Sequence, residues 1–293
     1  MWLPDVLKLR PPKILTTHGL LDRWTIKRSY WKKQLISWFG QRRWTANTPV
    51  IHVNNRQEVD DVKRYLGHPH PHVVVIPNGL RPAEFKKLPV RGLFRQEFGI
   101  RPEEKIILFL SRLNLKKGLD VLLPAFHRLS RERSDLRLVL VGPDDGYLST
   151  IQEFIQHHQL QERILLPGML IKEQKLAAFA DADVFTLPTY SESFAIAALE
   201  GLATGVPSLL TEHVGFGDYI RSYQSAHLCE PTEQSVYDGL TYLLDNPDKG
   251  AELARNAQRM IAEECDIDVL ARKLLAEYQS IVDNQQVEAF RKI

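Results

Sequence analysis

The stretch TLPTYSESFAIAALEGLATGVP, residues 186–207, decides the fold class of this 293-residue chain. It reads as a buried strand, a loop, a helix over 194–203 and a Gly-Val-Pro turn into the next strand. Glu192 lies in the loop and Glu200 lies on the helix, with seven residues between them. A helix that starts near Ser193 offers free backbone N–H groups and a positive dipole end to the loop, where phosphate is the natural ligand. As two isolated residues, the glutamates would more often be a helix-start acid and a solvated helix acid.

The same alternation of strand and helix extends on both sides of this stretch. Its strands are continuous apolar runs, which are typical of a parallel sheet covered on both faces. Ligands of such sheets sit at the carboxyl ends of the strands. The second half is expected to hold strands at Lys105–Leu110, Leu136–Val141, Arg163–Leu166, Ala182–Leu187 and Pro207–Thr211, alternating with helices at Leu119–Arg131, Tyr147–His158, Glu173–Ala180 and Phe194–Ala203. The first part is expected to hold strands at Lys13–Thr17, Thr48–Val53 and Val73–Ile76, a helix at Arg56–Leu66, and a polar connection over 81–104.

Composition agrees with a globular enzyme or binding protein. The chain is 44% hydrophobic and 25% charged, and its formal net charge is +2. The two cysteines, Cys229 and Cys265, lack the spacing of a zinc site or a disulfide framework, and a reducing cytoplasmic setting fits them. No apolar run approaches the roughly 20 residues of a membrane span. The start, MWLPDVLKLRPP, has no apolar core of a signal peptide.

Four segments together resemble the family-4 glycosyltransferases. The stretch from Glu192 resembles the family's E-x7-E signature, and three more segments follow the family's order: ILTTHGLLDRW (14–24), VVVIPNGL (73–80) and FLSRLNLKKGLDVLLPAF (109–126). The final helix, with LARKLLAEYQSIV, resembles the family's terminal helix. The resemblance implies an α/β fold of the GT-B type, with two Rossmann-like domains facing across a cleft. It divides the chain into 1–85 from the acceptor-side domain, 86–266 for the nucleotide-sugar-binding domain, and a helix at 267–293 that packs back toward the first domain.

Three positions depart from the family pattern. Ala195 stands where the family usually has Gly, and its methyl group slightly crowds a backbone approach to phosphate. Gly201 stands where Ala is usual, which lowers helix stability. Family members usually carry roughly a hundred further N-terminal residues, so the first domain is expected to be incomplete.

The resemblance also implies roles for single residues in a retaining transfer of a sugar from a nucleotide diphosphate sugar to an acceptor hydroxyl. Arg112 and Lys117 would hold the donor's diphosphate and stabilise its charge as it leaves, which suits one guanidinium and one ammonium on a loop. Alone, this pair would more often be a solvated loop. His18, in the first domain, would face the donor sugar and could hydrogen-bond a sugar hydroxyl, although a histidine at a strand end is as often an ordinary loop residue.

The remaining donor contacts come from the glutamate stretch and from one turn. Glu192 would contact the donor sugar and Glu200 the ribose hydroxyls. The backbone from Ser193 through Phe194 and Ala195 would approach the phosphates. The turn LPGML (166–170), which includes Met169 and Leu170, would contact the base.

Neither a metal nor a cofactor is expected. Asp181-Ala182-Asp183 has the form of a D-x-D metal motif, but it leads straight into a strand and reads better as a helix-to-strand turn. Asp144-Asp145-Gly146 is likewise a turn.

Residues 24–44, WTIKRSYWKKQLISWFGQRRW, are basic and aromatic. Trp24, Trp31 and Trp38 recur every seven residues on one helical face, and lysines flank that face. Such a helix could pack its tryptophans into the first domain, or it could lie on an anionic membrane at the inner surface. Nucleic acid is not an expected partner.

The sequence therefore predicts a cytoplasmic glycosyltransferase whose partners are a nucleotide-sugar donor and a glycan or lipid-linked acceptor. Two alternatives stay open. One is a non-catalytic protein that binds nucleotide sugar or serves as a scaffold. The other is a sugar-nucleotide epimerase or a phosphorylase of the same fold, although the chain shows no motif for a pyridoxal-phosphate lysine.

Overall fold

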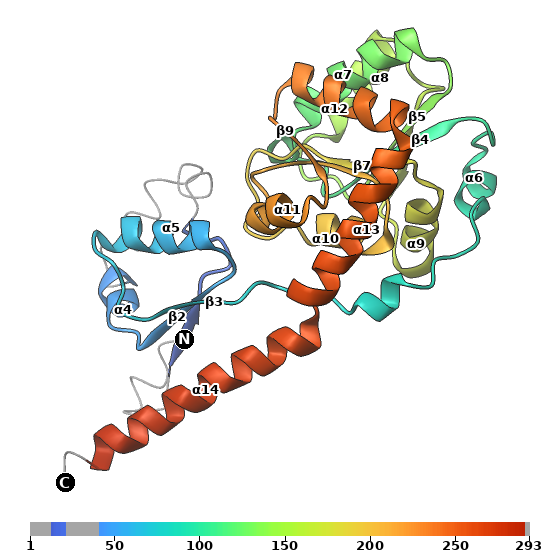
Figure 1. Ribbon diagram of the computed structural model, residues 1–293. Helices are drawn as coiled ribbons and strands as arrows, with labels where there is room; N and C mark the ends of the chain where they lie inside the picture. Colours follow the sequence, from blue (N-terminus) through green and yellow to red (C-terminus); the bar gives the residue numbers. More distant parts are fainter. Residues whose placement is uncertain (1–12, 22–40, 291–293) are drawn as a thin grey trace. The chain divides into compact units, whose positions relative to one another are not determined.

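The computed structural model describes residues 13–21 and 41–290, and it divides into two compact units (Figure 1). The first unit comprises Met1–Gly79 with Ile267–Ile293, and the second comprises Leu80–Asp266. The expected boundary after residue 85 differs from this division. Leu80 and Phe85 are buried in the hydrophobic core of the second unit, which draws the start of that unit back to Leu80.

The first unit contains a three-stranded parallel sheet in the order β1-β2-β3. Its elements are β1 (Ile14–Thr16), α4 (Arg42–Ala46), β2 (Val50–Val53), α5 (Arg56–Leu66), β3 (Val73–Val75) and α14 (Ile267–Phe290). A small core of Ile51, Val53, Val62 and Leu66 joins β2 to α5. Helix α5 begins where the Asn55 side chain accepts a hydrogen bond from the backbone of Glu58, and it ends at Gly67 in the left-handed conformation.

The second unit contains a six-stranded parallel sheet in the order β6-β5-β4-β7-β8-β9. Its strands are β4 (Lys105–Leu110), β5 (Leu136–Val141), β6 (Ile164–Gly168), β7 (Val184–Leu187), β8 (Ser208–Thr211) and β9 (His227–Cys229). The first strand of the unit lies in the middle, and the chain winds outward from it in both directions. This is the doubly wound order of a Rossmann fold, and it confirms the predicted fold class for this unit.

Helices cover both faces of the six-stranded sheet, as the apolar strands predicted. The layer on one face contains α7 (Leu119–Glu132), α8 (Leu148–His157) and α12 (Glu233–Asp245). The layer on the other face contains α9 (Lys172–Asp181), α10 (Ile196–Thr204), α11 (Gly217–Tyr223) and α13 (Pro247–Glu264). Figure 1 shows the two layers with the strands between them. Because both faces are covered, residues 106–109 of β4 and 138–140 of β5 are fully buried.

The expected connection over 81–104 contains structure that the sequence did not indicate. A 3-10 turn, η2 (Pro82–Phe85), and a helix, α6 (Leu93–Phe98), lie within it. Helix α6 is held by Asp181, which is fully buried at the end of α9 and accepts a hydrogen bond from the backbone of Arg95 at 2.9 Å. The Arg95 guanidinium in turn contacts Asp183 at 3.1 Å. Asp181 and Asp183 therefore lie at a helix-to-strand turn, as predicted, and they anchor the chain that enters the unit.

Two other expectations differ from the structure. The sheet has a sixth strand, β9, that was not predicted from the sequence. Helix α10 begins at Ile196, with Ala195 as its N-cap, rather than near Ser193. Ala195 has φ −47° and ψ 80°, so the chain is not yet helical there, and the loop that carries Glu192 is longer than expected.

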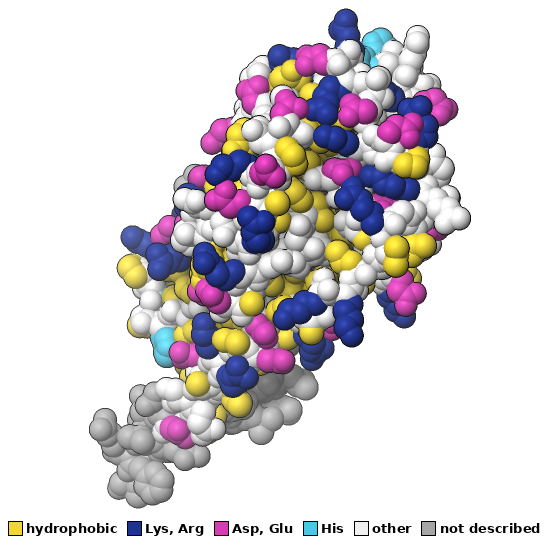
Figure 2. Space-filling model, turned by 45° about the vertical axis from the view of Figure 1, so that its right-hand side comes forward, with side chains coloured by type: hydrophobic (Ala, Val, Ile, Leu, Met, Phe, Trp, Pro, Cys, Tyr) yellow, Lys and Arg dark blue, Asp and Glu magenta, His cyan; other side chains and the backbone are white. Residues whose placement is uncertain are grey.

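The surface shows no dominance of one charge on the face drawn in Figure 2, where basic and acidic side chains are interspersed. Within the described ranges, no helix combines the length and the apolar character needed to cross a membrane. Trp24, Trp31 and Trp38 lie outside the described residues, so the expectation for this basic aromatic stretch stays a prediction.

Candidate functional site

The candidate site lies where the chain leaves the two central strands of the second unit. Strands β4 and β7 are neighbours, and the chain beyond each of them turns toward opposite edges of the sheet. In open parallel sheets this switch point leaves a crevice outside the carboxyl ends of the strands, and ligands bind there. Arg112 and Lys117 follow β4, and Glu192 follows β7, so the topology brings these predicted residues to the same edge.

The loop after β4 is held by short-range hydrogen bonds. Its 3-10 turn, η3 (Leu115–Lys117), begins where the Asn114 side chain accepts a hydrogen bond from the backbone of Lys116 at 2.9 Å. The amide of Asn114 also donates to the carbonyl of Asp145 at 2.8 Å, beyond β5. The loops after β4 and β5 therefore form one structure, and Asn114 contributes a fixing role that the sequence analysis did not assign.

Two glycines allow the loops to lie this close together. A Cβ atom on Gly118, which has φ +75°, would lie 1.9 Å from the carbonyl oxygen of Pro188 beyond β7. A Cβ atom on Gly142, which has φ +150°, would lie 1.8 Å from the carbonyl oxygen of Ser111. Neither distance is compatible with a side chain, so the approach of these backbones depends on glycine at both positions.

Arg112 and Lys117 occupy very different environments. The Arg112 side chain is 61% exposed, and its guanidinium contacts the Asp145 carboxylate at 2.5 Å. Lys117 is buried, and its ammonium contacts the carboxylate of Glu192 across the switch point. Burial, together with the nearby charge of Arg112, lowers the pKa of Lys117 to about 8. A buried cation paired with one carboxylate and flanked by an exposed arginine is suited to meet an anionic ligand.

The loop after β7 is braced by its neighbours on both sides. The Thr189 hydroxyl donates to the carbonyl of Lys116 at 2.9 Å, and the backbone of Glu192 donates to the carbonyl of His213 at 2.8 Å. The Tyr190 hydroxyl donates to Asp120 at 2.7 Å, in the first turn of α7. Burial raises the pKa of Tyr190 to about 12, and the bond to Asp120 adds to this shift. The Glu192 backbone is therefore fixed from the turn after β8, and the Tyr190 side chain from α7.

Glu200 lies on α10, and its carboxylate contacts the ammonium of Lys175 on α9 at 2.6 Å. The exposed fraction of the side chain is 14% for Glu200 and 23% for Lys175. Both glutamates of the E-x7-E pair thus have a lysine partner, and each lysine comes from a different element. Lys175 was not among the residues predicted from the sequence, because no spacing motif connects it to Glu200.

The other predicted donor contacts lie beside this edge. Phe194 and Ala195 are buried directly before α10, and the Phe194 ring packs on the Phe216 ring with centroids 5.5 Å apart. Beyond β6, Met169 is 66% exposed while Leu170 is buried. Met169 therefore presents its side chain to solvent. The side chains of Leu170 and Phe194 pack into the core, so these two residues can contact a ligand only through their backbone atoms.

His18 belongs to the first unit, directly after β1, and its side chain is exposed. Its backbone is in the left-handed region, with φ 43°. This conformation is uncommon for residues other than glycine, although histidine adopts it more readily than most. The preceding residue, Thr17, is buried, and its hydroxyl donates to the carboxylate of Glu58 at 2.5 Å. This hydrogen bond anchors the chain at the end of β1.

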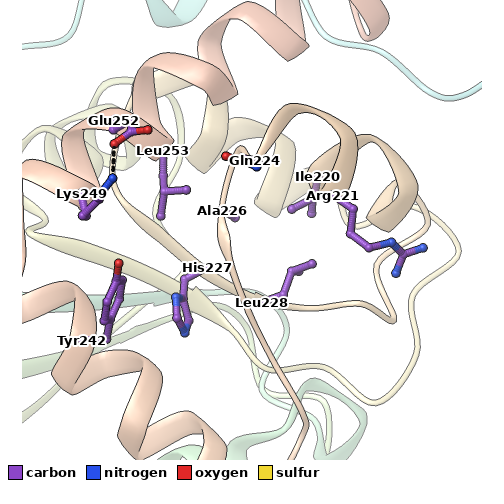
Figure 3. Close-up of a pocket in the computed structure, with 10 residues that line it drawn as sticks. All are labelled: Ile220, Arg221, Gln224, Ala226, His227, Leu228, Tyr242, Lys249, Glu252 and Leu253. Atoms are coloured by element: carbon purple, nitrogen blue, oxygen red, sulfur yellow. Dashed lines mark hydrogen bonds and ion pairs between the residues drawn. The ribbon is translucent and has the colours of Figure 1, made fainter.

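A separate cavity of about 340 Å³ lies at the opposite end of the same sheet (Figure 3). Its wall includes His227, the first residue of β9, whose ring stacks on Tyr242 with centroids 4.8 Å apart. Lys249 and Glu252, 2.8 Å apart, close another side. Because this cavity lies at the amino end of β9, it includes none of the predicted site residues. Among the described residues, no group of three or more His, Cys, Asp or Glu side chains could hold a metal ion.

Comparison with known families agrees with this architecture. The sequence pattern of the family described as "Glycosyl transferases group 1" matches residues 90–260, and that of "Glycosyltransferase Family 4" matches residues 2–84. The first match covers the second unit from just before α6 to α13, including every predicted site residue except His18. The second covers most of the first unit.

Individual proteins with similar sequences are also named as glycosyltransferases or sugar-lipid synthases. The chain is 25% identical over 224 residues to an uncharacterized glycosyltransferase of Methanocaldococcus jannaschii, covering 75% of this chain and 57% of that protein. It is 31% identical over 137 residues to alpha-monoglucosyldiacylglycerol synthase of Streptococcus pneumoniae, covering 45% of this chain and 31% of that protein. The chain thus spans little more than half, or less, of the length of these relatives.

Among solved structures, HepE of Anabaena in complex with UDP and glucose is similar with a TM-score of 0.81 and 18% identity. The similarity covers 94% of this chain and 73% of that one. Sucrose-phosphate synthase of Thermosynechococcus elongatus is similar with a TM-score of 0.79 and 20% identity, over 97% of this chain and 71% of that one. At this identity the likeness concerns the fold alone, and the fold is that of the GT-B glycosyltransferases. Family pattern, relatives and fold agree, and the chain belongs to the group 1 glycosyl transferases.

Proposed function

We propose that the chain transfers a sugar from a nucleotide diphosphate sugar to an acceptor hydroxyl, with the anomeric configuration retained. The observation that carries the proposal is the pairing of Lys117 with Glu192 across the switch point, beside the exposed cation Arg112. This arrangement offers positive charge for a diphosphate and a carboxylate for sugar hydroxyls in one place. HepE of Anabaena, which shares the fold, has been solved with UDP and glucose bound.

The donor is proposed to lie along the carboxyl edge of the six-stranded sheet. Arg112 and Lys117 hold the diphosphate, and Glu192 contacts the sugar. Glu200 accepts hydrogen bonds from the ribose. The backbone from Ser193 to Ala195 approaches the phosphates, while the turn with Met169 and Leu170 contacts the base. His18 is proposed to form a hydrogen bond with a hydroxyl of the donor sugar.

The proposed chemistry is a front-side displacement. The bond between the anomeric carbon and the diphosphate oxygen breaks, and the acceptor oxygen forms its bond on the same face of the sugar. The electron pair of the broken bond stays on the diphosphate, and the acceptor proton passes to that departing oxygen. Arg112 and Lys117 stabilise the negative charge as it develops, so they act mainly on the transition state.

Turnover and binding measurements on single variants test the assignment. Glu200→Ala should weaken UDP or GDP binding by about 1.5–3 kcal/mol, since a charge-assisted hydrogen bond is lost. Lys117→Ala should lower kcat, because its charge matters most as the leaving group departs, and it should also weaken binding of UDP or GDP, which carries the full charge of the leaving group. Calorimetry gives the affinities, and transfer or hydrolysis of UDP- and GDP-hexoses gives kcat. Wild-type values in both variants would place the site elsewhere.

The same assay separates the enzyme from a protein that only binds nucleotide sugars. Sugar transfer by the wild-type chain, reduced in Lys117→Ala, supports the enzyme. Nucleotide binding without turnover supports the binding protein.

Metal dependence is tested separately. Excess EDTA during calorimetry should leave UDP or GDP binding intact, because the proposed diphosphate contacts are side-chain cations and backbone N–H groups. Complete loss of binding on chelation would contradict this part of the proposal.

The acceptor is proposed to be a glycan or a lipid-linked hydroxyl. One relative, from Streptococcus pneumoniae, is named as a synthase of a glucosylated diacylglycerol. The basic aromatic residues 24–44 would suit peripheral contact with an anionic membrane on its cytoplasmic side.

A further inference from the structure

The Glu200 carboxylate has a single polar partner within the described chain, the ammonium of Lys175. The contact, at 2.6 Å, runs from Lys175 Nζ to Glu200 Oε1, and it joins α9 to α10. Both side chains are largely shielded from water, with 14% of Glu200 and 23% of Lys175 exposed. An ion pair so placed is screened less by water and salt than an exposed surface pair.

We propose that Lys175 is a positioning residue for nucleotide recognition. It holds Glu200 by Oε1, which leaves Oε2 to accept hydrogen bonds from ribose hydroxyls. It also neutralises the carboxylate that the ribose meets. This inference rests on the proposed function, in which Glu200 binds the ribose of the donor.

The charge of the ligand explains why a counter-ion is needed. A nucleoside diphosphate is strongly anionic, and an unpaired carboxylate beside its ribose would repel it. The negative charge of Glu192 is compensated in the same way, by the ammonium of Lys117. Lys117 follows β4 whereas Lys175 lies on α9, so the two glutamates are neutralised independently.

Orientation supplies a second reason. A glutamate side chain has several rotatable bonds, and fixing them when a ligand binds lowers the affinity. The contact with Lys175 fixes the carboxylate of Glu200 before the nucleotide arrives, so that cost falls on folding rather than on binding.

A purely structural role for Lys175 makes a different prediction. If the ion pair served only to join α9 and α10, its loss would loosen the site and weaken all nucleotides alike. If it positions Glu200, the loss should weaken ligands that carry ribose hydroxyls more than their dideoxy forms. The comparison of a ribonucleotide with its dideoxy form therefore separates the two roles.

Calorimetry with the full chain tests the inference, using UDP against 2′,3′-dideoxy-UDP and GDP against its dideoxy form. The wild-type protein should prefer the ribonucleotide by about tenfold or more, as expected for hydrogen bonds to a charged group. Lys175→Met should reduce that preference severalfold, and it should weaken the dideoxy nucleotide by a smaller factor, because the uncompensated charge of Glu200 repels both diphosphates. Lys175→Arg, which keeps a cation beside Glu200, should restore most of the preference.

Lys249→Met is the matched control, because Lys249 forms a similar pair with Glu252 in the same unit but on the exposed surface. It should keep the wild-type preference, and thermal unfolding should show that every variant is folded. An equal loss for both nucleotides in Lys175→Met, an unchanged preference, or tighter UDP binding would overturn the inference while leaving the proposed function in place. A wild-type chain that binds neither UDP nor GDP would overturn the proposed function as well.

Discussion

Lys117 is the residue whose protonation should govern ligand binding. It is buried, it contacts Glu192, and its burial and the charge of Arg112 lower its pKa to about 8. If Lys117 faces the diphosphate as proposed, a bound nucleoside diphosphate adds negative charge beside the ammonium and raises that pKa again. The complex therefore holds more protons than the free protein above about pH 8, so binding is coupled to proton uptake in that range.

This coupling predicts that UDP or GDP affinity is highest below about pH 8 and falls as the pH rises through that value, by up to about tenfold per pH unit. Calorimetry at about pH 7 and about pH 9 measures the change. Lys117→Met should bind more weakly at the lower pH and lose the pH dependence, whereas Lys249→Met should retain it. An affinity that is constant across this range in the wild-type protein would show that Lys117 does not face the diphosphate.

At the level of structural elements, the loops after β4 and β7 depend on a glycine at the start of α7. Gly118 has φ +75°, and a Cβ atom there would lie 1.9 Å from the carbonyl oxygen of Pro188. Gly146, before α8, has φ +88° but no atom within 4 Å of such a Cβ. A side chain at either position would strain the backbone, because both residues have a positive φ. Only at Gly118 would the side chain also clash with a neighbouring backbone.

Gly146→Ala should therefore lower the free energy of unfolding by about 1–2 kcal/mol, the cost of a left-handed alanine. Gly118→Ala should lower it by clearly more, and it should also weaken nucleotide binding because the loops that carry Lys117 and Glu192 must separate. Denaturant unfolding and calorimetry measure the two effects. Equal destabilisation by both substitutions would mean that the loops have room to move apart without cost.

On the scale of the whole molecule, charge is distributed unevenly along the chain. The formal net charge is only +2, yet the first fifty residues carry ten Lys and Arg residues against Asp5 and Asp22. Attraction to an anionic membrane is worth about 1 kcal/mol per basic residue near the surface, and salt screens it. The stretch 24–44 is therefore expected to bring the protein to anionic vesicles at low ionic strength.

Co-sedimentation with vesicles that contain phosphatidylserine tests this expectation at low and high salt. The double substitution Lys32→Glu and Lys33→Glu should abolish most of the binding, and high salt should do the same to the wild-type protein. Lys86→Glu with Lys87→Glu changes the charge equally at exposed positions of the second unit and should have little effect. Equal loss of binding in both double variants would indicate a general charge effect rather than a site in 24–44.

The sequence by itself determined the fold class, the succession of most strands and helices, and the family of this protein. These features are local: apolar runs and helical periodicity depend on neighbouring residues, and the motifs around Glu192, Arg112 and the segment 73–80 are contiguous. The helix at 93–98 and strand β9 were missed because they are short and are stabilised by distant partners, such as the buried Asp181 that holds α6.

Only the tertiary structure decided how the charged residues pair. Lys117 and Glu192 are 75 residues apart, and they meet because β4 and β7 are neighbours in the sheet order. Lys175 and Glu200 meet because α9 and α10 lie in the same helical layer. Strand order and helix packing arise from burying the whole core at once, so no local pattern in the sequence could have indicated that each glutamate has its own lysine.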